Sequence, residues 1–223
     1  AHPTIDSLVL NAGVMATPFA LTEDGLESQI GTNHFGHHLL TKLLLPQVEA
    51  AAKKAGVATI VVVSSSRHYM SYREGVRLSL AALNDPAAYD RTSAYAQSKL
   101  ANVLFAQELA DRVQDRGILV NAVHPGLVDT ELSRHMIEAV GGVVGEQAAR
   151  YIRETVVASL AWSPQDAALT QIYAAVSPQL KERKTTGKYF HPIARETKPD
   201  PHCTNATLQT ALWEFTEKFI AAH

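Results

Sequence analysis

The chain has 223 residues, of which 46% are hydrophobic and 19% are charged, and its formal net charge is -2. This length is enough to bury one core, and the composition excludes a disordered chain and argues against nucleic acid as a partner. No apolar run approaches the roughly 20 residues that a bilayer span needs, so we expect no membrane span, and the single cysteine, Cys203, fits a reducing compartment such as the cytoplasm.

The first 54 residues predict a buried strand followed by a long helix. A short apolar run stops at Asn11, Ala12 and Gly13, in the way that a buried parallel strand ends in a tight turn. From about residue 22 to 54, apolar residues recur every three or four positions, which places them on one face of a helix. Asn33 lies in the middle of this face. A buried amide needs hydrogen-bond partners, so Asn33 is expected to do more than pack.

Two runs rich in β-branched residues predict the central strands of a sheet. Residues 58–63 read Ala-Thr-Ile-Val-Val-Val, too β-branched for a helix, and lead directly into three serines. Residues 118–123 form a similar run that ends just before a Pro-Gly turn. Between the two runs, the pair at 92–93 (Thr-Ser) offers a start signal for a helix over residues 95–116.

The C-terminal part predicts three more helices and one short strand. The helices are expected near residues 146–160, 164–176 and 208–221, and the strand near residues 188–190. Strands that alternate with helices of a dozen residues form a parallel sheet covered on both faces. We therefore predict a single α/β domain over residues 1–223, with a doubly wound, Rossmann-like parallel sheet flanked by helices.

Distinctive polar and glycine-rich residues follow three of the predicted strands. They are the Asn-Ala-Gly at 11–13, the serines at 64–66, and Pro125 with Gly126. In a doubly wound sheet, ligands bind beyond the carboxyl ends of the strands. The sequence therefore predicts a binding site at this edge of the sheet.

Tyr95 and Lys99 are four residues apart on a predicted helix, so their side chains share one face. An ammonium group beside a phenol favours the phenolate, and we expect it to lower the phenol's pKa from about 10 toward physiological pH. Such a pair can act as a general acid or base on an alcohol or carbonyl oxygen, and a nearby serine can hydrogen-bond the same oxygen. A Tyr-Lys pair alone is common in structural helices. The order of all these motifs along the chain favours the catalytic interpretation.

In this order the motifs resemble those of the short-chain dehydrogenase/reductases, especially the branch of the retinol dehydrogenases and WW-domain oxidoreductases. The resemblance covers nearly the whole chain, including its closing strand and helix at 187–190 and 212–215. Its most specific parts are residues 32–41 (Thr-Asn-His-Phe-Gly-His-His-Leu-Leu-Thr) and 93–102 (Ser-Ala-Tyr-Ala-Gln-Ser-Lys-Leu-Ala-Asn). It implies an oxidoreductase that uses NADP or NAD and interconverts an alcohol and a carbonyl by hydride transfer.

The resemblance also implies the catalytic residues. Tyr95 would exchange the proton with the substrate oxygen, Ser65 would be the catalytic serine, and Asn33 would hold a water that links Lys99 to solvent. A register shift of one residue would move the serine's role to Ser64 or Ser66.

The cofactor contacts are implied in the same way. Lys99 would also bind the nicotinamide ribose, and Tyr95 would contact the cofactor beside it. The Asn11, Ala12 and Gly13 segment would support the adenine side of the cofactor and the central sheet. The nicotinamide carboxamide would contact Pro125, Gly126 and Thr130.

One departure from the family pattern concerns the start of the chain. The family opens with a strand and a glycine-rich turn that cradles the pyrophosphate, and no such turn precedes Leu8. We interpret the chain as an N-terminally truncated fragment of the domain, so the choice between NAD and NADP stays open. The strand near Leu8 would then be an apolar sheet edge that invites aggregation or a homo-oligomer. We expect residues 1–223 alone to bind dinucleotide weakly or not at all.

Apolar residues between 127 and 144 could form a lid over the site, and core packing explains them about as well. A lid would indicate a lipophilic alcohol, aldehyde or ketone of retinoid or steroid type as the substrate.

Three other interpretations are open. A Ser-His hydrolase lacks its Gly-x-Ser-x-Gly elbow here. A metal site from His34, His37 and His38 has helical spacing, and it lacks an acidic or cysteine ligand. A truncated, inactive dehydrogenase-like binding module is the alternative to an enzyme.

Overall fold

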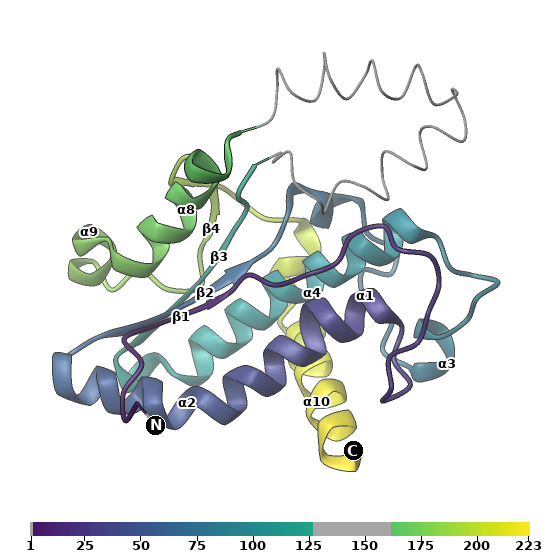
Figure 1. Ribbon diagram of the computed structural model, residues 1–223, viewed down its shortest axis with the longest axis horizontal. Helices are drawn as coiled ribbons and strands as arrows, with labels where there is room; N and C mark the ends of the chain where they lie inside the picture. Colours follow the sequence, from purple (N-terminus) through teal and green to yellow (C-terminus); the bar gives the residue numbers. More distant parts are fainter. Residues whose placement is uncertain (1, 127–161) are drawn as a thin grey trace.

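A computed structural model of the protein describes residues 2–126 and 162–223 and contains a five-stranded sheet with helices on both faces (Figure 1). The strands lie in chain order across the sheet, and the first four are parallel, whereas the fifth pairs antiparallel with the fourth. They are β1 (Ser7–Leu10), β2 (Ala58–Val63), β3 (Ile118–Val123), β4 (Tyr189–His191) and β5 (Arg195–Glu196). This arrangement confirms the predicted α/β, Rossmann-like class.

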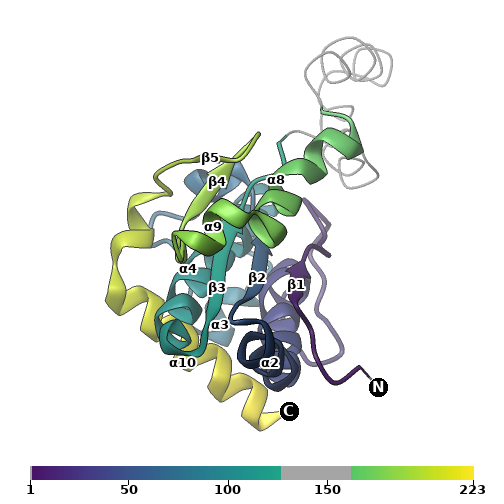
Figure 2. The ribbon, with the colours of Figure 1, turned by 90° about the vertical axis from the view of Figure 1, so that its left-hand side faces the viewer.

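The helices form two layers, one on each face of the sheet (Figure 2). One layer holds α1 (Ser28–Ile30), the π-helical η1 (Gly31–Phe35), α2 (Gly36–Ala55), α4 (Arg91–Arg112) and α10 (Ala206–Ala222). The other holds α8 (Pro164–Val176) and α9 (Pro178–Glu182). Shorter turns are η2 (Ser66–Met70), α3 (Leu80–Leu83), η3 (Gln114–Arg116) and η6 (Pro201–Thr204).

Alternating side chains of the central strands explain the two layers, because successive residues of a strand point to opposite faces. Ile60 and Val62 of β2 belong to the large core beneath α2 and α4. Val61 and Val63 belong to a smaller core with residues of α8, α9 and β4. All six residues of β2 and all six of β3 are buried, as expected for central strands of a covered parallel sheet.

Several predicted boundaries are confirmed, and others need correction. The strands at 58–63 and 118–123 and the helix at 164–176 have the predicted bounds. The helix predicted over 22–54 begins at Ser28, because the Glu27 side chain caps its first N–H groups. This helix also contains the π-helical turn η1. The helix predicted over 95–116 begins at Arg91, because Asp90 is its N-cap and accepts a hydrogen bond from the Ser93 N–H. The helix predicted near 146–160 lies outside the described residues.

The C-terminal helix α10 is held against η1 and α2 by buried histidines. The Nε2 atom of His34 lies 3.0 Å from the Thr216 hydroxyl oxygen, and both side chains are fully buried. His38 is hydrogen-bonded to Glu217 at 2.7 Å and lies against the ring of Trp213. Polar groups placed in this way satisfy each other's hydrogen-bonding capacity within an otherwise apolar helix contact.

We expect Thr216→Val to lower the free energy of unfolding by about 1 to 3 kcal/mol, because it leaves a buried imidazole nitrogen of His34 without its partner. Urea unfolding followed by circular dichroism measures this change. Thr207→Val, at an exposed position early in the same helix, is the control and is expected to leave stability nearly unchanged. Equal stability of wild type and Thr216→Val would contradict this account of how α10 is attached.

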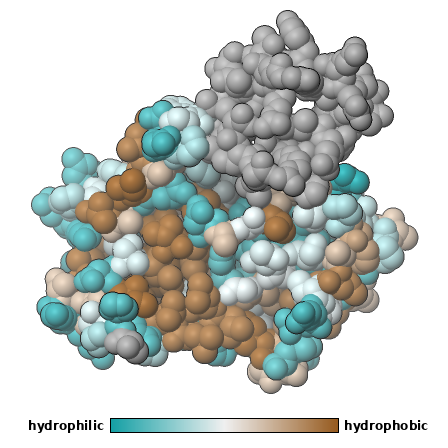
Figure 3. Space-filling view, viewed as in Figure 1, coloured by the Kyte–Doolittle hydropathy of each residue, from teal (hydrophilic) through white to brown (hydrophobic). Residues whose placement is uncertain are grey.

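Among the described residues β1 is an edge strand that pairs with β2 alone, and it lies in an apolar part of the surface. Figure 3 shows a hydrophobic area over β1, α2 and α8. The large hydrophobic side chains of these elements that are exposed are Val9, Leu39, Leu40, Leu43, Leu169, Ile172 and Val176. An open strand edge beside apolar side chains favours association with another chain. Within residues 2–126 and 162–223, no helix is long and apolar enough to cross a bilayer.

Candidate active site

The polar segments that follow the first three strands meet at one edge of the sheet. Leu10 of β1 pairs with Val62 of β2, and Val63 of β2 pairs with Val123 of β3, so the three strands end side by side. The Ser64 N–H donates to the Val123 carbonyl at 2.8 Å, which continues the pairing into the serine segment. The predicted convergence of these strand ends is confirmed.

The three serines after β2 occupy different environments. Ser64 is buried, and its hydroxyl donates to the Lys99 carbonyl at 2.7 Å, so it ties β2 to α4. Ser66 is exposed. Ser65 is half-buried, caps η2 by accepting a hydrogen bond from the Arg67 N–H at 3.2 Å, and lies close enough to the Tyr95 side chain to act on its pKa. Of the three, Ser65 is therefore the serine that meets the predicted proton donor.

Tyr95 and Lys99 lie on the buried face of α4, one helical turn apart, and their side chains are 5% and 4% exposed. The Lys99 ammonium donates to the Val63 carbonyl at 3.2 Å, and its Nζ atom lies 5.7 Å from the centre of the Tyr95 ring. Burial lowers the pKa of Lys99 to about 8, because desolvation disfavours the charged form.

The predicted lowering of the Tyr95 pKa is wrong for this structure. Burial raises the pKa of Tyr95 to about 12, while the hydrogen bond with Ser65 and the charge of Arg67 act in the opposite direction with smaller effect. The reason is that the ammonium of Lys99 is directed at the Val63 carbonyl, so desolvation of the phenolate outweighs its stabilisation. Tyr95 is consequently a neutral phenol here, the form that can donate a proton.

Asn33 lies in the π-helical turn η1 and is fully buried. Its side-chain oxygen accepts a hydrogen bond from the Val14 N–H at 2.8 Å, and its amide group donates to the Val14 carbonyl and to the Ser98 hydroxyl, both at 2.9 Å. Ser98 in turn donates to the Tyr95 carbonyl at 2.7 Å. Asn33 thus joins the loop after β1 to helix α4, which accounts for an amide on this face.

Gly13 allows a close approach between that loop and the two buried groups. A Cβ atom built on Gly13 would lie 2.8 Å from the Asn33 Oδ1 atom and 3.4 Å from the Lys99 Nζ atom. Any side chain at this position would therefore displace one of them. Gly13, Asn33 and Lys99 form one compact group at the strand ends.

The remaining predicted cofactor residues lie around this group, with one exception. Asn11 and Ala12 are exposed after β1, and the Asn11 side-chain oxygen accepts a hydrogen bond from the Gln171 amide at 2.9 Å. Pro125 and Gly126 are half-buried after β3, and Gly126 has a φ of 99°, a conformation that favours glycine. Thr130 and the predicted lid over 127–144 lie outside the described residues.

Two polar residues of the site were not predicted from the sequence. Asn102 is fully buried and donates to the same Val63 carbonyl as Lys99, at 3.1 Å. Its position three residues after Lys99, on the same helical face, was the available signal. His68 is fully buried beside Ser65, and its Nδ1 atom lies 2.7 Å from the Ser65 carbonyl oxygen.

The histidine positions bear on the two other site interpretations. In a Ser-His hydrolase the imidazole bonds the serine hydroxyl, whereas His68 is bonded to the carbonyl of Ser65. His34 and His38 are bonded to residues of α10. In the described part of the chain, no three His, Cys, Asp or Glu side chains are grouped so that they could hold a metal ion.

Comparison with known proteins places this chain in a family. The family model for short chain dehydrogenases matches residues 78–140. Over 219 residues the chain is 40% identical to the chloroplastic short-chain dehydrogenase TIC 32 A of Brassica napus, covering 97% of this chain and 64% of that protein. It is 36% identical to retinol dehydrogenase 14 of Mus musculus, covering 98% of this chain and 60% of that protein. The chain thus spans less than two thirds of the length of these relatives.

Solved structures agree with this assignment. An uncharacterised protein from Mycobacterium paratuberculosis superposes with a TM-score of 0.63 at 30% identity, covering 97% of this chain and 67% of that one. A 3-ketoacyl-(acyl-carrier-protein) reductase from Brucella melitensis, complexed with NADH, shares the fold with a TM-score of 0.58 at 20% identity, covering 84% of this chain and 65% of that one. The chain belongs to the short-chain dehydrogenase/reductase family, in its retinol-dehydrogenase-like branch.

Proposed function

We propose that this chain is the catalytic part of an NAD(P)-dependent oxidoreductase that interconverts an alcohol and a carbonyl. The observation that carries the proposal is a buried phenol, Tyr95, whose pKa the side chain of the neighbouring Ser65 lowers, at the carboxyl edge of a parallel sheet. A second buried group, the Lys99 ammonium, lies one helical turn away. These are the groups that a proton transfer to a carbonyl oxygen needs.

The buried residues fit a nicotinamide dinucleotide. The Val63 carbonyl takes one donor of the Lys99 ammonium, which has three, so the hydroxyls of a ribose could accept the others. Gly13 leaves the space beside Lys99 and Asn33 free of side-chain atoms. Lys99, with Tyr95 and the residues Asn11 to Gly13, Pro125 and Gly126, would hold the group, and Thr130 is proposed from the family resemblance alone.

The bound dinucleotide would supply or accept the hydride. In the direction of carbonyl reduction, the Ser65 hydroxyl donates a hydrogen bond to the substrate oxygen and stabilises the negative charge that develops on it. The Tyr95 phenol, held neutral by burial, donates its proton to that oxygen and completes the alcohol. The positive charge of Arg67 favours the phenolate that remains, whereas Lys99, directed at the Val63 carbonyl, would hold the ribose of the cofactor. Asn33 positions the turn of α4 that carries Tyr95 through Ser98, and it holds the loop after β1 through Val14.

A lipophilic substrate of retinoid or steroid type is the finer part of the proposal. Relatives are named retinol dehydrogenase 14 and, at 38% identity over 212 residues, polyprenol dehydrogenase, both of Mus musculus. Each of these names describes an alcohol with a long apolar part.

We also propose that residues 1–223 form one catalytic domain, that the protein is cytoplasmic, and that it forms an oligomer through the open edge of β1. Localisation of a fluorescent fusion tests the location. Analytical ultracentrifugation tests the oligomer.

The experiment that tests the function uses the full-length protein that contains this chain. Purified protein is incubated with NADPH or NADH and with retinal or a steroid ketone, and loss of the reduced nicotinamide is followed by absorbance. We expect turnover with at least one pair and none from Ser65→Ala. Equal turnover by wild type and Ser65→Ala would refute the proposed site, and an absence of turnover with every pair would refute the substrate class.

The exposed edge of β1 supports a second candidate, a binding module without catalysis. Calorimetric titration of NADPH and NADH into the full-length protein separates the two. The same titration into residues 1–223 alone tests the weak binding that the sequence predicts. We expect binding too weak to measure at micromolar concentration, and submicromolar binding would contradict this expectation. If the full-length protein also binds neither nucleotide, the binding module is the better description.

A further inference from the structure

A histidine outside the proposed catalytic group is bonded directly to the backbone of the catalytic serine. His68 lies in η2, three residues after Ser65, and its side chain is 0% exposed. Its Nδ1 atom lies 2.7 Å from the Ser65 carbonyl oxygen. Its Nε2 atom accepts a hydrogen bond from the Asp200 N–H at 3.0 Å.

The two contacts determine where the proton of the imidazole lies. A backbone N–H can only donate, so the Nε2 atom that faces Asp200 must be the unprotonated nitrogen. The Nδ1 atom therefore carries the hydrogen and donates it to the Ser65 carbonyl. Burial lowers the pKa of His68, which agrees with a neutral ring. Both nitrogens of this buried ring are thus satisfied in a single tautomer.

The Ser65 carbonyl is held by two donors from the same residue. Besides the imidazole, the backbone N–H of His68 donates to it at 3.1 Å. On the other side of Ser65, its hydroxyl meets Tyr95. We propose that His68 is a positioning residue, whose imidazole fixes the backbone of Ser65 so that the Ser65 hydroxyl stays beside Tyr95. This inference rests on the proposed oxidoreductase function.

The Asp200 end of this connection is itself fixed in place. The Asp200 carboxylate accepts hydrogen bonds from the backbone N–H of His202, at 2.8 Å, and pairs with its ring at 2.7 Å. The other ring nitrogen of His202 lies 3.3 Å from the Arg73 carbonyl, and the Tyr69 hydroxyl donates to the Lys198 carbonyl at 2.5 Å. The segment around Asp200, far from Ser65 in the sequence, therefore supports the serine through His68.

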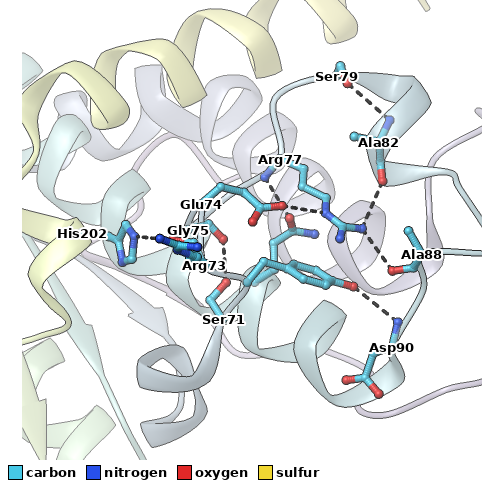
Figure 4. Close-up of polar contacts among 12 residues, drawn as sticks. Ser71, Arg73, Glu74, Gly75, Arg77, Ser79, Ala82, Ala88, Asp90 and His202 are labelled. Carbon is cyan, nitrogen blue, oxygen red and sulfur yellow. Dashed lines mark hydrogen bonds and ion pairs between the residues drawn. The ribbon is translucent and has the colours of Figure 1, made fainter.

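The loop that follows η2 is anchored as well, as Figure 4 shows. The Arg77 guanidinium pairs with Glu74 at 3.1 Å and donates to the carbonyls of Ala82 and Ala88, each at 3.3 Å. Asp90, the N-cap of α4, lies at the end of this network. This loop supports His202 through the Arg73 carbonyl, so the Asp200 end of the connection through His68 is attached to a fixed frame.

Three substitutions of His68 in the full-length protein separate the contribution of its Nδ1 contact with Ser65 from that of its Nε2 contact with Asp200. Asparagine places an amide donor where Nδ1 was, glutamine places an amide oxygen where Nε2 was, and leucine removes both. We expect His68→Leu and His68→Gln to lower kcat by about 10- to 100-fold with little change in KM, because the serine hydroxyl is misplaced. His68→Asn is expected to restore most of kcat. A larger primary deuterium isotope effect in the slow variants would place the loss in the hydride-transfer step.

A matched control and a second measurement guard against a purely structural effect. His38→Asn alters a histidine that is equally buried and faces α10, and it is expected to lower stability without changing kcat. Nitrogen NMR of the wild type is expected to show His68 as the neutral tautomer protonated at Nδ1. A ring protonated at Nε2 would overturn the inference, and so would wild-type kcat in folded His68→Leu.

The outcome also separates this inference from the function on which it rests. If Ser65→Ala is inactive and folded His68→Leu is fully active, only the role of His68 is refuted. If Ser65→Ala keeps full activity, the proposed function itself fails.

Discussion

Replacing Tyr95 with phenylalanine in the full-length protein is expected to lower kcat by about a hundred- to ten-thousand-fold, the range that general acid catalysis contributes. The phenol is the buried proton donor beside Ser65, and its ring makes the packing contacts, which phenylalanine keeps. Cofactor affinity, measured by calorimetry, is therefore expected to stay near the wild-type value. Steady-state assays with the reduced nucleotide give kcat and KM separately.

Tyr173→Phe is the matched control for this substitution. Tyr173 also lies on a helix that covers the sheet and packs against Phe190, at a ring-centre distance of 5.9 Å. Losing its hydroxyl is expected to leave kcat unchanged. If Tyr95→Phe keeps most of the wild-type activity, Tyr95 has no part in proton transfer and the proposed mechanism is wrong.

The fold could be predicted because its signals are local and agree with one another. Residues 58–63 and 118–123 are strands by composition alone, and each ends at a residue pattern that turns the chain. Helix bounds were less accurate wherever a side chain, and not the apolar pattern, decides the end. Asp90 starts α4 before the residues that the pattern indicated, whereas Glu27 starts α1 at Ser28, after the predicted residue 22.

The residues of the site could be predicted from the sequence, whereas the pKa values of Tyr95 and Lys99 could not. Helical spacing places Tyr95 and Lys99 on one face but does not reveal how deeply that face is buried or which atom the ammonium meets. Both facts decide the pKa values, since desolvation raises one and lowers the other. His68 was missed for a related reason: its second partner, Asp200, lies 132 residues away in the chain.

The second prediction with a large expected effect is that the stability of the protein depends on pH, because several histidines are buried. Burial is the main cause that lowers the pKa of each of them below its ordinary value of 6.5. They are His34, His37, His38 and His68, and for His37 the pKa falls to about 4. In the unfolded chain the same residues bind protons at an ordinary pKa.

The free energy of unfolding is therefore expected to fall as the pH drops from 6.5 toward 4. The unfolded state binds more protons than the folded state in this window, and stability then decreases as the pH is lowered. His37 alone accounts for a loss of about 1 kcal/mol by about pH 5.5. Lys99 does not contribute, because its lowered pKa of about 8 lies above the window. Glu27, whose pKa burial raises, acts in the opposite direction near the acidic end.

Urea unfolding at a series of pH values between 7 and 5 measures this dependence by linear extrapolation. The slope of the free energy of unfolding against pH is proportional to the number of protons taken up on unfolding. Substituting one buried histidine, as in His34→Gln, is expected to reduce that number by about one, whatever the substitution does to stability at neutral pH. His2→Gln, at an exposed position, is the control and is expected to keep the slope of the wild type. A free energy of unfolding that stays constant from pH 7 to 5 would mean that these rings accept protons in the folded state, and the buried contacts of His34 with Thr216 and of His68 with Ser65 would then have to be abandoned.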